Sequence, residues 1–167
     1  MLMAIYHLHC KVFSRSKGQT AIAAAAYRSG TKLEDHELDT VSYYTKKKGI
    51  AFSEIALPSN APKEYADREV LWNAVQEVEK SKDAQLCREF EIALPKELSL
   101  VEQIELVRTF AKSLVNEGMI ADYSIHDKND GNPHVHILTT MRGIDDKGKW
   151  MSKQKKIYSL DEGGNRN

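Results

Sequence analysis

The chain has 167 residues, and its 24 basic side chains balance its 24 acidic ones. This length suits a single domain that buries a core of its own, and two cysteines, Cys10 and Cys87, offer no disulfide framework. No apolar run approaches the about 20 residues of a membrane-spanning helix, and nothing near Met1 resembles a secretion signal. We therefore expect a cytoplasmic protein without membrane insertion.

The neutral total hides an uneven distribution of charge. Residues 1–32 hold five basic and no acidic side chains, and residues 142–156 hold six basic against two acidic ones. Residues 33–141 carry 12 basic and 20 acidic side chains. Such asymmetry is typical of a protein that offers one positive surface to a polyanion such as nucleic acid.

The first third of the chain predicts a strand and a helix. Side chains alternate over residues 3–13, as in a strand, and an alanine-rich helix is expected over residues 19–28, with Ser16 as its N-cap and Gly30 just beyond its end. Tyr27 then lies in the last turn of the helix. Residues 31–49 are charged and lack periodicity, so we expect a partly ordered loop there.

A five-residue motif occurs twice in the rest of the chain. Glu-Ile-Ala-Leu-Pro occurs at residues 54–58 and again at 91–95, each time between a strand-like run and a helical segment. The helices are expected over residues 67–80 and 99–117, where apolar side chains recur at helical spacing. Two strands, 119–126 and 133–141, flank a turn-rich segment and predict a hairpin. The order β α β α β α β β indicates an α+β sandwich.

Three histidines in the expected hairpin form a candidate metal site. His134 and His136 are two residues apart and share a strand face, and His126 can meet them across the hairpin. Three neutral imidazoles leave coordination positions open, which suits a catalytic divalent ion better than a structural zinc. The alternative is three ordinary surface histidines, the commoner case for a His-x-His word alone.

A metal-bound histidine usually donates its second N–H to a carboxylate or a carbonyl. Glu89 and Glu91 share one face of the strand expected over residues 85–94, and Glu89 is our candidate for that partner, although both can also face solvent. Asp122 lies on the His126 face of its strand but farther away, so it ranks lower. His7 and His9 lack a third partner and are interpreted as structural or DNA-facing.

Short motifs follow one another along nearly the whole chain: Ala4-Ile-Tyr-His7, Ser14-Arg-Ser-x-Gly18-Gln, Ala23-Ala-Ala-Ala-Tyr27-Arg, Asp67-Arg-Glu-x-Leu-Trp72, Arg88-Glu89 through Leu94-Pro95, Asn116-Glu-Gly-Met119, and His126 with His134-x-His136. In these motifs, and in their order, the chain resembles the MobA/MobL family of plasmid relaxases, which are HUH endonucleases. The resemblance implies a central five-stranded antiparallel sheet flanked by helices, a ferredoxin- or RRM-like sandwich.

The resemblance also implies an activity and a set of roles. Tyr27 would be the nucleophile, Glu89 would orient a histidine, and His126, His134 and His136 would bind the metal. The implied reaction is site- and strand-specific nicking and rejoining of DNA at a plasmid origin of transfer, through a 5′-phosphotyrosine intermediate. The implied cofactor is Mg²⁺ or Mn²⁺, although Zn²⁺ or Ni²⁺ could occupy the site.

The implied partners are single-stranded DNA, with a hairpin at the origin of transfer, and the accessory and coupling proteins of a bacterial, plasmid-encoded system. Basic residues near the expected site are candidates for phosphate contacts, which position DNA without reading its sequence. These candidates are Arg15, Lys17, Arg28, Lys46, Lys47, Lys48, Arg142, Lys147 and Lys149.

Phosphoryl transfer onto tyrosine also has chemical support of its own. A phenol has an unperturbed pKa of about 10, so a tyrosine nucleophile needs a cation or a base nearby at neutral pH. A metal on three histidines can supply that charge. The alternative for Tyr27 alone is packing, since an aromatic residue on an alanine-rich helix is more often part of a core.

Three other functions stay open. A rolling-circle replication initiator uses the same HUH chemistry, but those proteins place the histidine word before the tyrosine. A binding module would use the basic ends and Tyr6, Tyr43 or Tyr44 as stacking surfaces, without a metal. A three-histidine zinc hydrolase would attack with hydroxide and leave no protein–DNA adduct. We expect the catalytic domain over residues 1–145, and a basic tail over 146–167 that leads to a further C-terminal region.

Overall fold

A computed structural model describes residues 7–154 and residue 163 of the chain. Five antiparallel strands form one sheet in the order β1-β5-β7-β6-β4, with β1 and β4 at its edges. The strands are β1 (Leu8–Ser14), β4 (Ile50–Ala56), β5 (Gln85–Ala93), β6 (Ala121–His126) and β7 (His134–Thr140). The α+β class and the five-stranded antiparallel sheet predicted from the sequence are confirmed.

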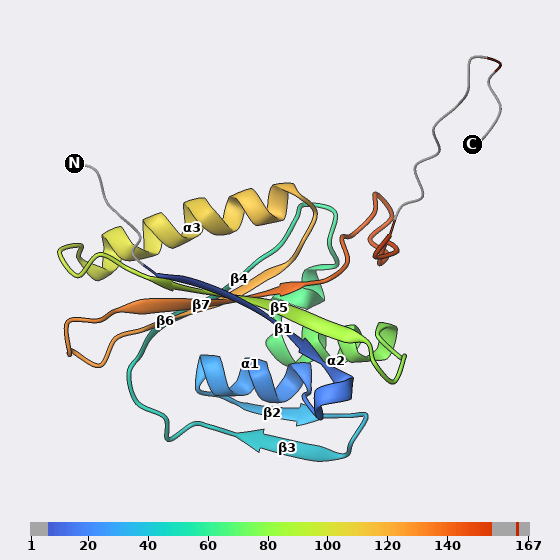
Figure 1. Cartoon of the computed structure of the whole chain (residues 1–167), viewed down its shortest axis with the longest axis horizontal. Helices are drawn as coiled ribbons and strands as arrows, with labels where there is room; N and C mark the ends of the chain where they lie inside the picture. Colours follow the sequence, from blue (N-terminus) through green and yellow to red (C-terminus); the bar gives the residue numbers. More distant parts are fainter. Residues whose placement is uncertain (1–6, 155–162, 164–167) are drawn as a thin grey trace.

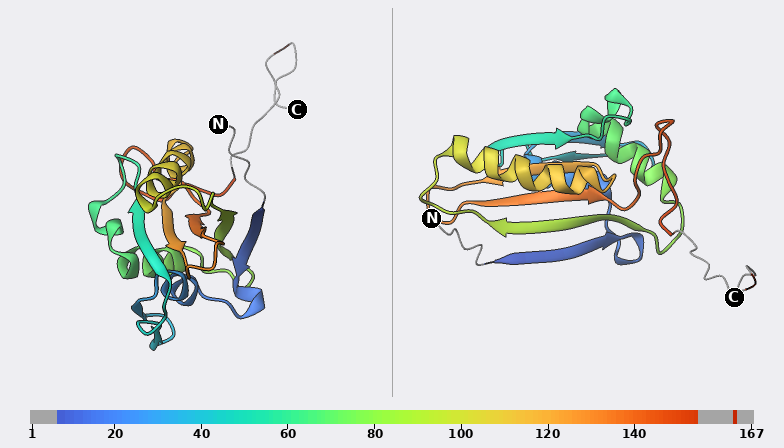
Figure 2. Two further views of the ribbon diagram at one scale, coloured as in Figure 1. Left: turned by 90° about the vertical axis from the view of Figure 1, so that its left-hand side faces the viewer. Right: turned by 90° about the horizontal axis from the view of Figure 1, so that it is seen from above.

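Helices cover both faces of this sheet (Figure 1). The helix α3 (Leu100–Asn116) packs on one face, where Val107 and Ala111 join a core with Ile125 and Ile137 of the sheet. On the other face lie α1 (Ala21–Ser29) and α2 (Arg68–Val78), and two short 3₁₀ helices, Arg15–Lys17 and Lys63–Ala66, precede them. The two further views show the same layers, with α3 and the α1 layer on opposite sides of the strands (Figure 2).

Alanine is responsible for the close contact between α1 and the sheet. Small side chains let the helix backbone approach its neighbours closely. Four alanines of α1 are buried in this way: Ala21, Ala24, Ala25 and Ala26. Thr20 caps α1 by accepting a hydrogen bond from the backbone N–H of Ala23, and Gly30 ends the helix in the left-handed conformation. The prediction of Ser16 as the N-cap is wrong. Its hydroxyl bonds that of Ser14, at the start of the preceding 3₁₀ turn.

Residues 31–49, expected to be a partly ordered loop, contain a second small sheet. β2 (Lys32–Asp35) and β3 (Thr40–Tyr43) pair as a hairpin that packs beneath α1. Leu33 and Asp35 are buried, and Asp35 accepts hydrogen bonds from the backbone of Glu37 and Leu38 and from the side chain of Gln76 on α2. Only these two side chains of β2 are buried, so the apolar pattern of the segment is too short to predict a strand from the sequence.

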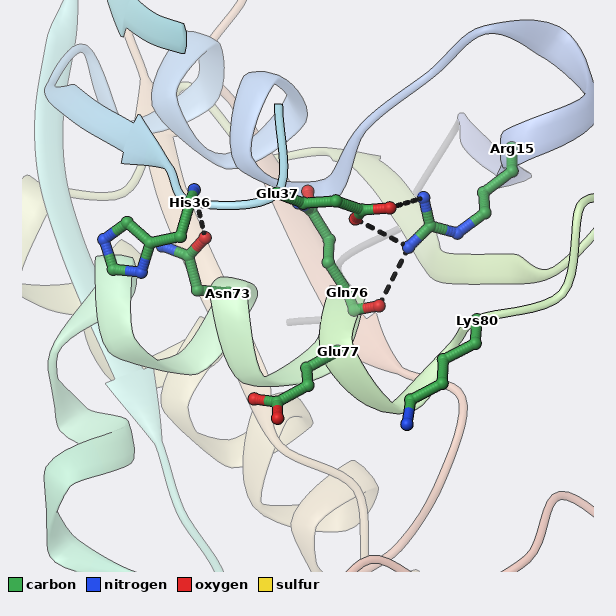
Figure 3. A pocket seen from close by; sticks show the side chains of 7 residues that line it. All are labelled: Arg15, His36, Glu37, Asn73, Gln76, Glu77 and Lys80. Carbon is green, nitrogen blue, oxygen red and sulfur yellow. Dashed lines mark hydrogen bonds and ion pairs between the residues drawn. The ribbon is translucent and has the colours of Figure 1, made fainter. Parts of the chain in front are cut away.

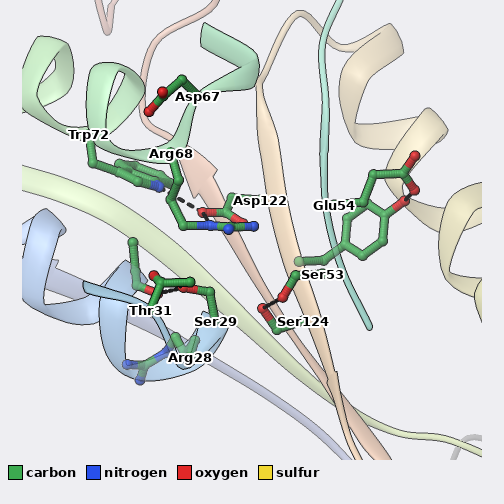
Figure 4. A network of polar contacts seen from close by, with 12 residues as sticks. Arg28, Ser29, Thr31, Ser53, Glu54, Asp67, Arg68, Trp72, Asp122 and Ser124 are labelled. Atoms are coloured by element: carbon green, nitrogen blue, oxygen red, sulfur yellow. Dashed lines mark hydrogen bonds and ion pairs between the residues drawn. The ribbon is translucent and has the colours of Figure 1, made fainter. Parts of the chain in front are cut away.

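A polar network fastens α2 to the sheet (Figure 4). Asp122 of β6 is buried and accepts two hydrogen bonds from the guanidinium nitrogen Nε of Arg68, a third from Nη2, and one from the indole N–H of Trp72 at 2.8 Å. Asp122 is thus fully engaged in joining α2 to β6 and does not reach the histidines. Its low rank as a site residue agrees with this position.

The segment after β7 stays with the domain for several residues. Ile144 bridges to Trp150, and the Trp150 ring stacks on Tyr65 with centroids 5.3 Å apart. The expected tail at residues 146–167 therefore begins inside this packed turn, and the part of it beyond residue 154, except residue 163, lies outside the described residues. Among the described helices, we find none with the length and apolar character needed to cross a membrane.

Candidate metal and nucleophile site

The β6–β7 hairpin brings the three histidines together, as the sequence predicted. His126 pairs directly with His134 across the hairpin, and His136 follows on the same face of β7. The ring centroids lie 4.5 Å apart for His126 and His136, 5.0 Å for His134 and His136, and 5.4 Å for His126 and His134. One nitrogen from each ring lies within 4.8 Å of the other two, which is close enough for all three to bind one ion.

Each imidazole has one nitrogen engaged by an oxygen acceptor. His126 Nε2 lies 2.7 Å from the carbonyl of Arg28, His134 Nδ1 lies 3.1 Å from the carbonyl of Asn132, and His136 Nδ1 lies 3.2 Å from Oε2 of Glu89. Because carbonyl and carboxylate oxygens only accept, the ring nitrogen carries the hydrogen at each contact. The other nitrogen of each ring keeps its lone pair. Each ring therefore keeps one nitrogen lone pair that can bind a divalent ion.

Burial keeps the central histidine neutral. His126 is buried, and desolvation lowers its pKa to about 4, with the charges of its neighbours adding to the effect and the Arg28 carbonyl opposing it. A neutral ring is the form that binds a metal, so no proton has to leave His126 at physiological pH. This donor set fits a divalent cation that accepts nitrogen ligands.

Glu89 is the buried carboxylate behind these histidines. Its side chain is 1% exposed, and it accepts hydrogen bonds from His136 and from Nε of Arg28, while Lys11 Nζ lies 3.6 Å from its other oxygen. Burial opposes its ionisation, but the hydrogen bonds from His136 and Arg28 outweigh burial and lower the pKa of Glu89 to about 2. An ionised Glu89 holds the Nδ1 hydrogen of His136 and so fixes which nitrogen of that ring is free.

A second group of possible ligands competes less well. Glu89, Glu91 and His136 also place one ligand atom each within 4.8 Å of one another. In that group, however, the charge of Glu89 is already balanced by ion pairs with Arg28 and Lys11, and Glu89 accepts the Nδ1 hydrogen of His136. The three-histidine set is therefore the better metal site.

Tyr27 reaches the same end of the molecule from α1. The carbonyl of Arg28, the next residue, contacts His126, and Figure 1 shows the C-terminal end of α1 at the same end of the sheet as the β6–β7 turn. Tyr27 is 47% exposed. Its ring meets the ring of Tyr44 edge-on, and Lys47 Nζ donates to its carbonyl at 2.9 Å.

The predicted DNA-contacting residues fall into two groups. Arg28 and Lys47 lie beside Tyr27, and Lys46 and Lys48 are exposed in the same turn. Lys11, which was not among the residues predicted from the sequence, joins them through its ion pair with Glu89. The alternation of β1 indicated only which face of the strand Lys11 occupies. Lys11 comes close to Glu89 because β1 pairs with β5 in the folded protein.

The other candidates lie away from the histidines. Arg15 donates hydrogen bonds of 2.8 Å to both carboxylate oxygens of Glu37, and it also donates to the carbonyls of Gln76 and Glu79. These residues lie beside a cavity of about 370 Å³ (Figure 3). Arg142 pairs with the buried side chain of Glu79. These two arginines therefore hold elements of the fold together. The remaining candidates, at exposed positions, are Lys17 in the turn before α1 and Lys147 and Lys149 in the turn after β7.

His7 and His9 are exposed on the edge strand or just before it. His9 pairs with Glu91 of β5 and belongs to no group of metal ligands among the described residues. Cys10 is exposed and Cys87 is buried, and both are free thiols.

Known proteins resemble this chain over most of its length. The profile of the MobA/MobL family matches residues 19–167. Conjugal transfer protein TraA of Rhizobium radiobacter is 40% identical over 174 residues, an alignment that covers 97% of this chain and 15% of that protein. Mobilization protein MobL of Acidithiobacillus ferridurans is 42% identical over 185 residues, covering 95% of this chain and 47% of that protein. The chain thus spans less than half the length of these curated relatives.

A solved structure also matches the fold. It comes from work on the "Molecular Basis of Vancomycin Resistance Transfer in Staphylococcus aureus" and superimposes with a TM-score of 0.87 at 40% sequence identity. The match covers 97% of this chain and 83% of that one.

Proposed function

The chain belongs to the MobA/MobL family, and from this membership and its metal and nucleophile site we propose that it is a relaxase domain. The domain would nick one DNA strand at a plasmid origin of transfer and rejoin it later. The observation that carries the proposal is the contact between His126 and the carbonyl of Arg28. This contact supports the proposal because it joins the three-histidine group, whose ligand atoms lie within 4.8 Å of one another, to the end of the helix that bears Tyr27.

Tyr27 is the proposed nucleophile. Its hydroxyl oxygen bonds to the scissile phosphorus and gives up its proton, while the bond from phosphorus to the 3′ oxygen breaks. The electron pair leaves with that oxygen, which takes up a proton, and the 5′ phosphate stays on the tyrosine. No water is consumed, so the reverse attack by a 3′-hydroxyl reseals a strand. A hydrolase would not need Tyr27 for its chemistry.

The surrounding residues would bind and orient the reactants. His126, His134 and His136 would hold the metal, with Glu89 fixing the ring of His136. When bound there, Mg²⁺ or Mn²⁺ supplies positive charge to the non-bridging oxygens of the scissile phosphate. Zn²⁺ or Ni²⁺ also suits nitrogen ligands.

Basic side chains and partners complete the proposal. Lys11 and Arg28 would add positive charge beside the phosphate, and Lys46 and Lys48 would contact neighbouring phosphates. The substrate would be single-stranded DNA with a hairpin, presented with accessory and coupling proteins in the bacterial cytoplasm.

Covalent capture tests this function. The protein is incubated with a randomised pool of single-stranded DNA and Mn²⁺, and the products are separated on a denaturing gel. We expect a metal-dependent protein–DNA band that disappears with chelator and in Tyr27→Phe, which lacks the attacking oxygen. Cleavage without a covalent band would favour the three-histidine hydrolase instead, and binding without cleavage, on a pool that covers the recognition length, would favour a binding module.

A further inference from the structure

Lys47 differs from the two lysines beside it. Lys46 and Lys48 are exposed, whereas Lys47 is half-buried. The backbone N–H of Lys47 donates to the carbonyl of Tyr44 at 3.0 Å, which closes a turn toward α1. From this turn the Lys47 side chain reaches Tyr27 twice. Its Nζ donates to the Tyr27 carbonyl at 2.9 Å and lies 3.4 Å from the centroid of the Tyr27 ring.

Tyr44 contacts the same ring. Its ring centroid is 5.2 Å from that of Tyr27 at an interplanar angle of 89°, the edge-to-face geometry that aromatic pairs favour. Tyr44 is anchored in turn, since its backbone N–H donates to the carbonyl of Thr31 just beyond α1 at 3.0 Å. The exposed Tyr27 ring is therefore contacted by an ammonium and by an aromatic ring from one short segment, residues 44–47.

Partial burial of Lys47 strengthens its contact with the Tyr27 ring. Burial, followed by the charges of Arg28 and Lys128, lowers the pKa of Lys47, and Glu89 opposes this shift. A partly desolvated ammonium gains more from the face of an aromatic ring than a hydrated one does. Arg28 is also near, with its guanidinium carbon 5.8 Å from the Tyr27 ring centroid.

We propose that Lys47 is a positioning residue that fixes the Tyr27 ring for attack on phosphorus, with Tyr44 as its second support. The proposal rests on the proposed function, because positioning matters only if Tyr27 attacks. In-line transfer depends on the angle of approach, and a misplacement of about 1 Å can cost roughly 100-fold in rate. Lys47 therefore acts on the chemical step, whereas Lys46 and Lys48 act on DNA affinity.

Kinetics separate these two roles. Single-turnover adduct formation is measured on a strand captured from the randomised pool, over a range of DNA concentrations. We expect Lys47→Gln to lower the rate at saturating DNA roughly 10- to 100-fold without raising the DNA concentration needed for half-saturation. Lys47→Arg keeps a cation and donors and should restore most of the rate. Lys46→Gln, the matched change, should act on the DNA concentration dependence instead.

A second measurement does not depend on cleavage. In metal-free protein labelled with ¹³C in the tyrosine rings, the Tyr27→Phe variant identifies the Tyr27 resonance. Lys47→Gln should shift this resonance in a protein that is otherwise folded, and Lys46→Gln should leave it in place. A shifted resonance in a protein that cuts no DNA would support the positioning contact while the proposed function fails.

Two results would overturn the inference. One is an unmoved Tyr27 resonance in Lys47→Gln. The other is a Lys47→Gln variant that reaches the wild-type rate at saturating DNA and, like Lys46→Gln, merely needs more DNA to do so.

Discussion

Single residues decide the protonation pattern of the site. Glu89 is ionised inside the protein because His136 and Arg28 donate to it, and an ionised Glu89 in turn fixes the free nitrogen of His136. Removing this carboxylate would leave the half-buried Arg28 without its partner. Uncompensated buried charge of this kind is costly. Glu89 therefore links the orientation of the His136 ring to the stability of the fold.

The pH dependence of stability tests this link. The pKa of Glu89 falls from 4.5 to about 2 on folding, so the carboxylate stabilises the fold above pH 4.5 and loses that contribution as the pH falls toward 2. The shift corresponds to roughly 3 kcal/mol at most. Urea unfolding should therefore show wild type more stable than Glu89→Gln at pH 7, with a difference that shrinks toward pH 2. A difference that is independent of pH would contradict this role of Glu89.

The sequence predicted some residues of the site better than others. The spacing of the three histidines predicted that they meet across the hairpin. The alternation of β5 put Glu89 and Glu91 on one face alike, and Tyr27 was indicated by the resemblance to relaxases. Lys11 and Lys47 gave no comparable signal. Lys11 reaches Glu89 only through the pairing of β1 with β5, and Lys47 reaches Tyr27 only through the turn at Tyr44. The positions of Lys11 and Lys47 depend on contacts between distant segments, and local sequence patterns do not show such contacts.

At the scale of elements, the long helices and the β6–β7 hairpin were predictable because their apolar periodicity and turn residues agree. The small β2–β3 sheet was not, since two strands of four residues each bury too few side chains to leave a pattern. The start of α1 shows a related limit. Ser16 and Thr20 both suit an N-cap, and only the intervening 3₁₀ turn and Gly18 select Thr20.

The N-cap of α1 depends on a single side-chain hydrogen bond. Thr20→Ala removes the acceptor of the Ala23 N–H and should cost about 1 kcal/mol of unfolding free energy. Ser16→Ala, at the position expected from sequence, should cost less than about 0.5 kcal/mol. Urea unfolding at neutral pH would measure both losses. Equal losses in the two variants would argue that Thr20 is not the cap.

The proposed nucleophile and the candidate metal ligands lie on separate layers of the molecule. Tyr27 lies on a helix of one layer, and the histidines lie on two central strands of the sheet. The hydrogen bond from His126 to the Arg28 carbonyl joins these layers at the site. Metal binding should therefore stabilise the complete fold, because the ligands converge only in the folded state.

Thermal unfolding in Mn²⁺ tests this expectation. At a Mn²⁺ concentration of about 100 times the dissociation constant, binding adds about 2.7 kcal/mol and should raise the melting temperature. His134→Ala removes one ligand and should abolish most of the rise. His9→Ala, an exposed histidine on the edge strand, should keep it. A rise that survives His134→Ala would place the metal elsewhere.

The proposed function requires that Tyr27 becomes covalently joined to DNA. Its most direct test is mass spectrometry of proteolytic fragments from protein trapped on single-stranded DNA with Mn²⁺. We expect one peptide, containing Tyr27 and carrying a 5′-phosphorylated nucleotide on the phenolic oxygen. A nucleotide on another side chain such as Tyr44, or cleaved DNA with every peptide unmodified, would contradict it.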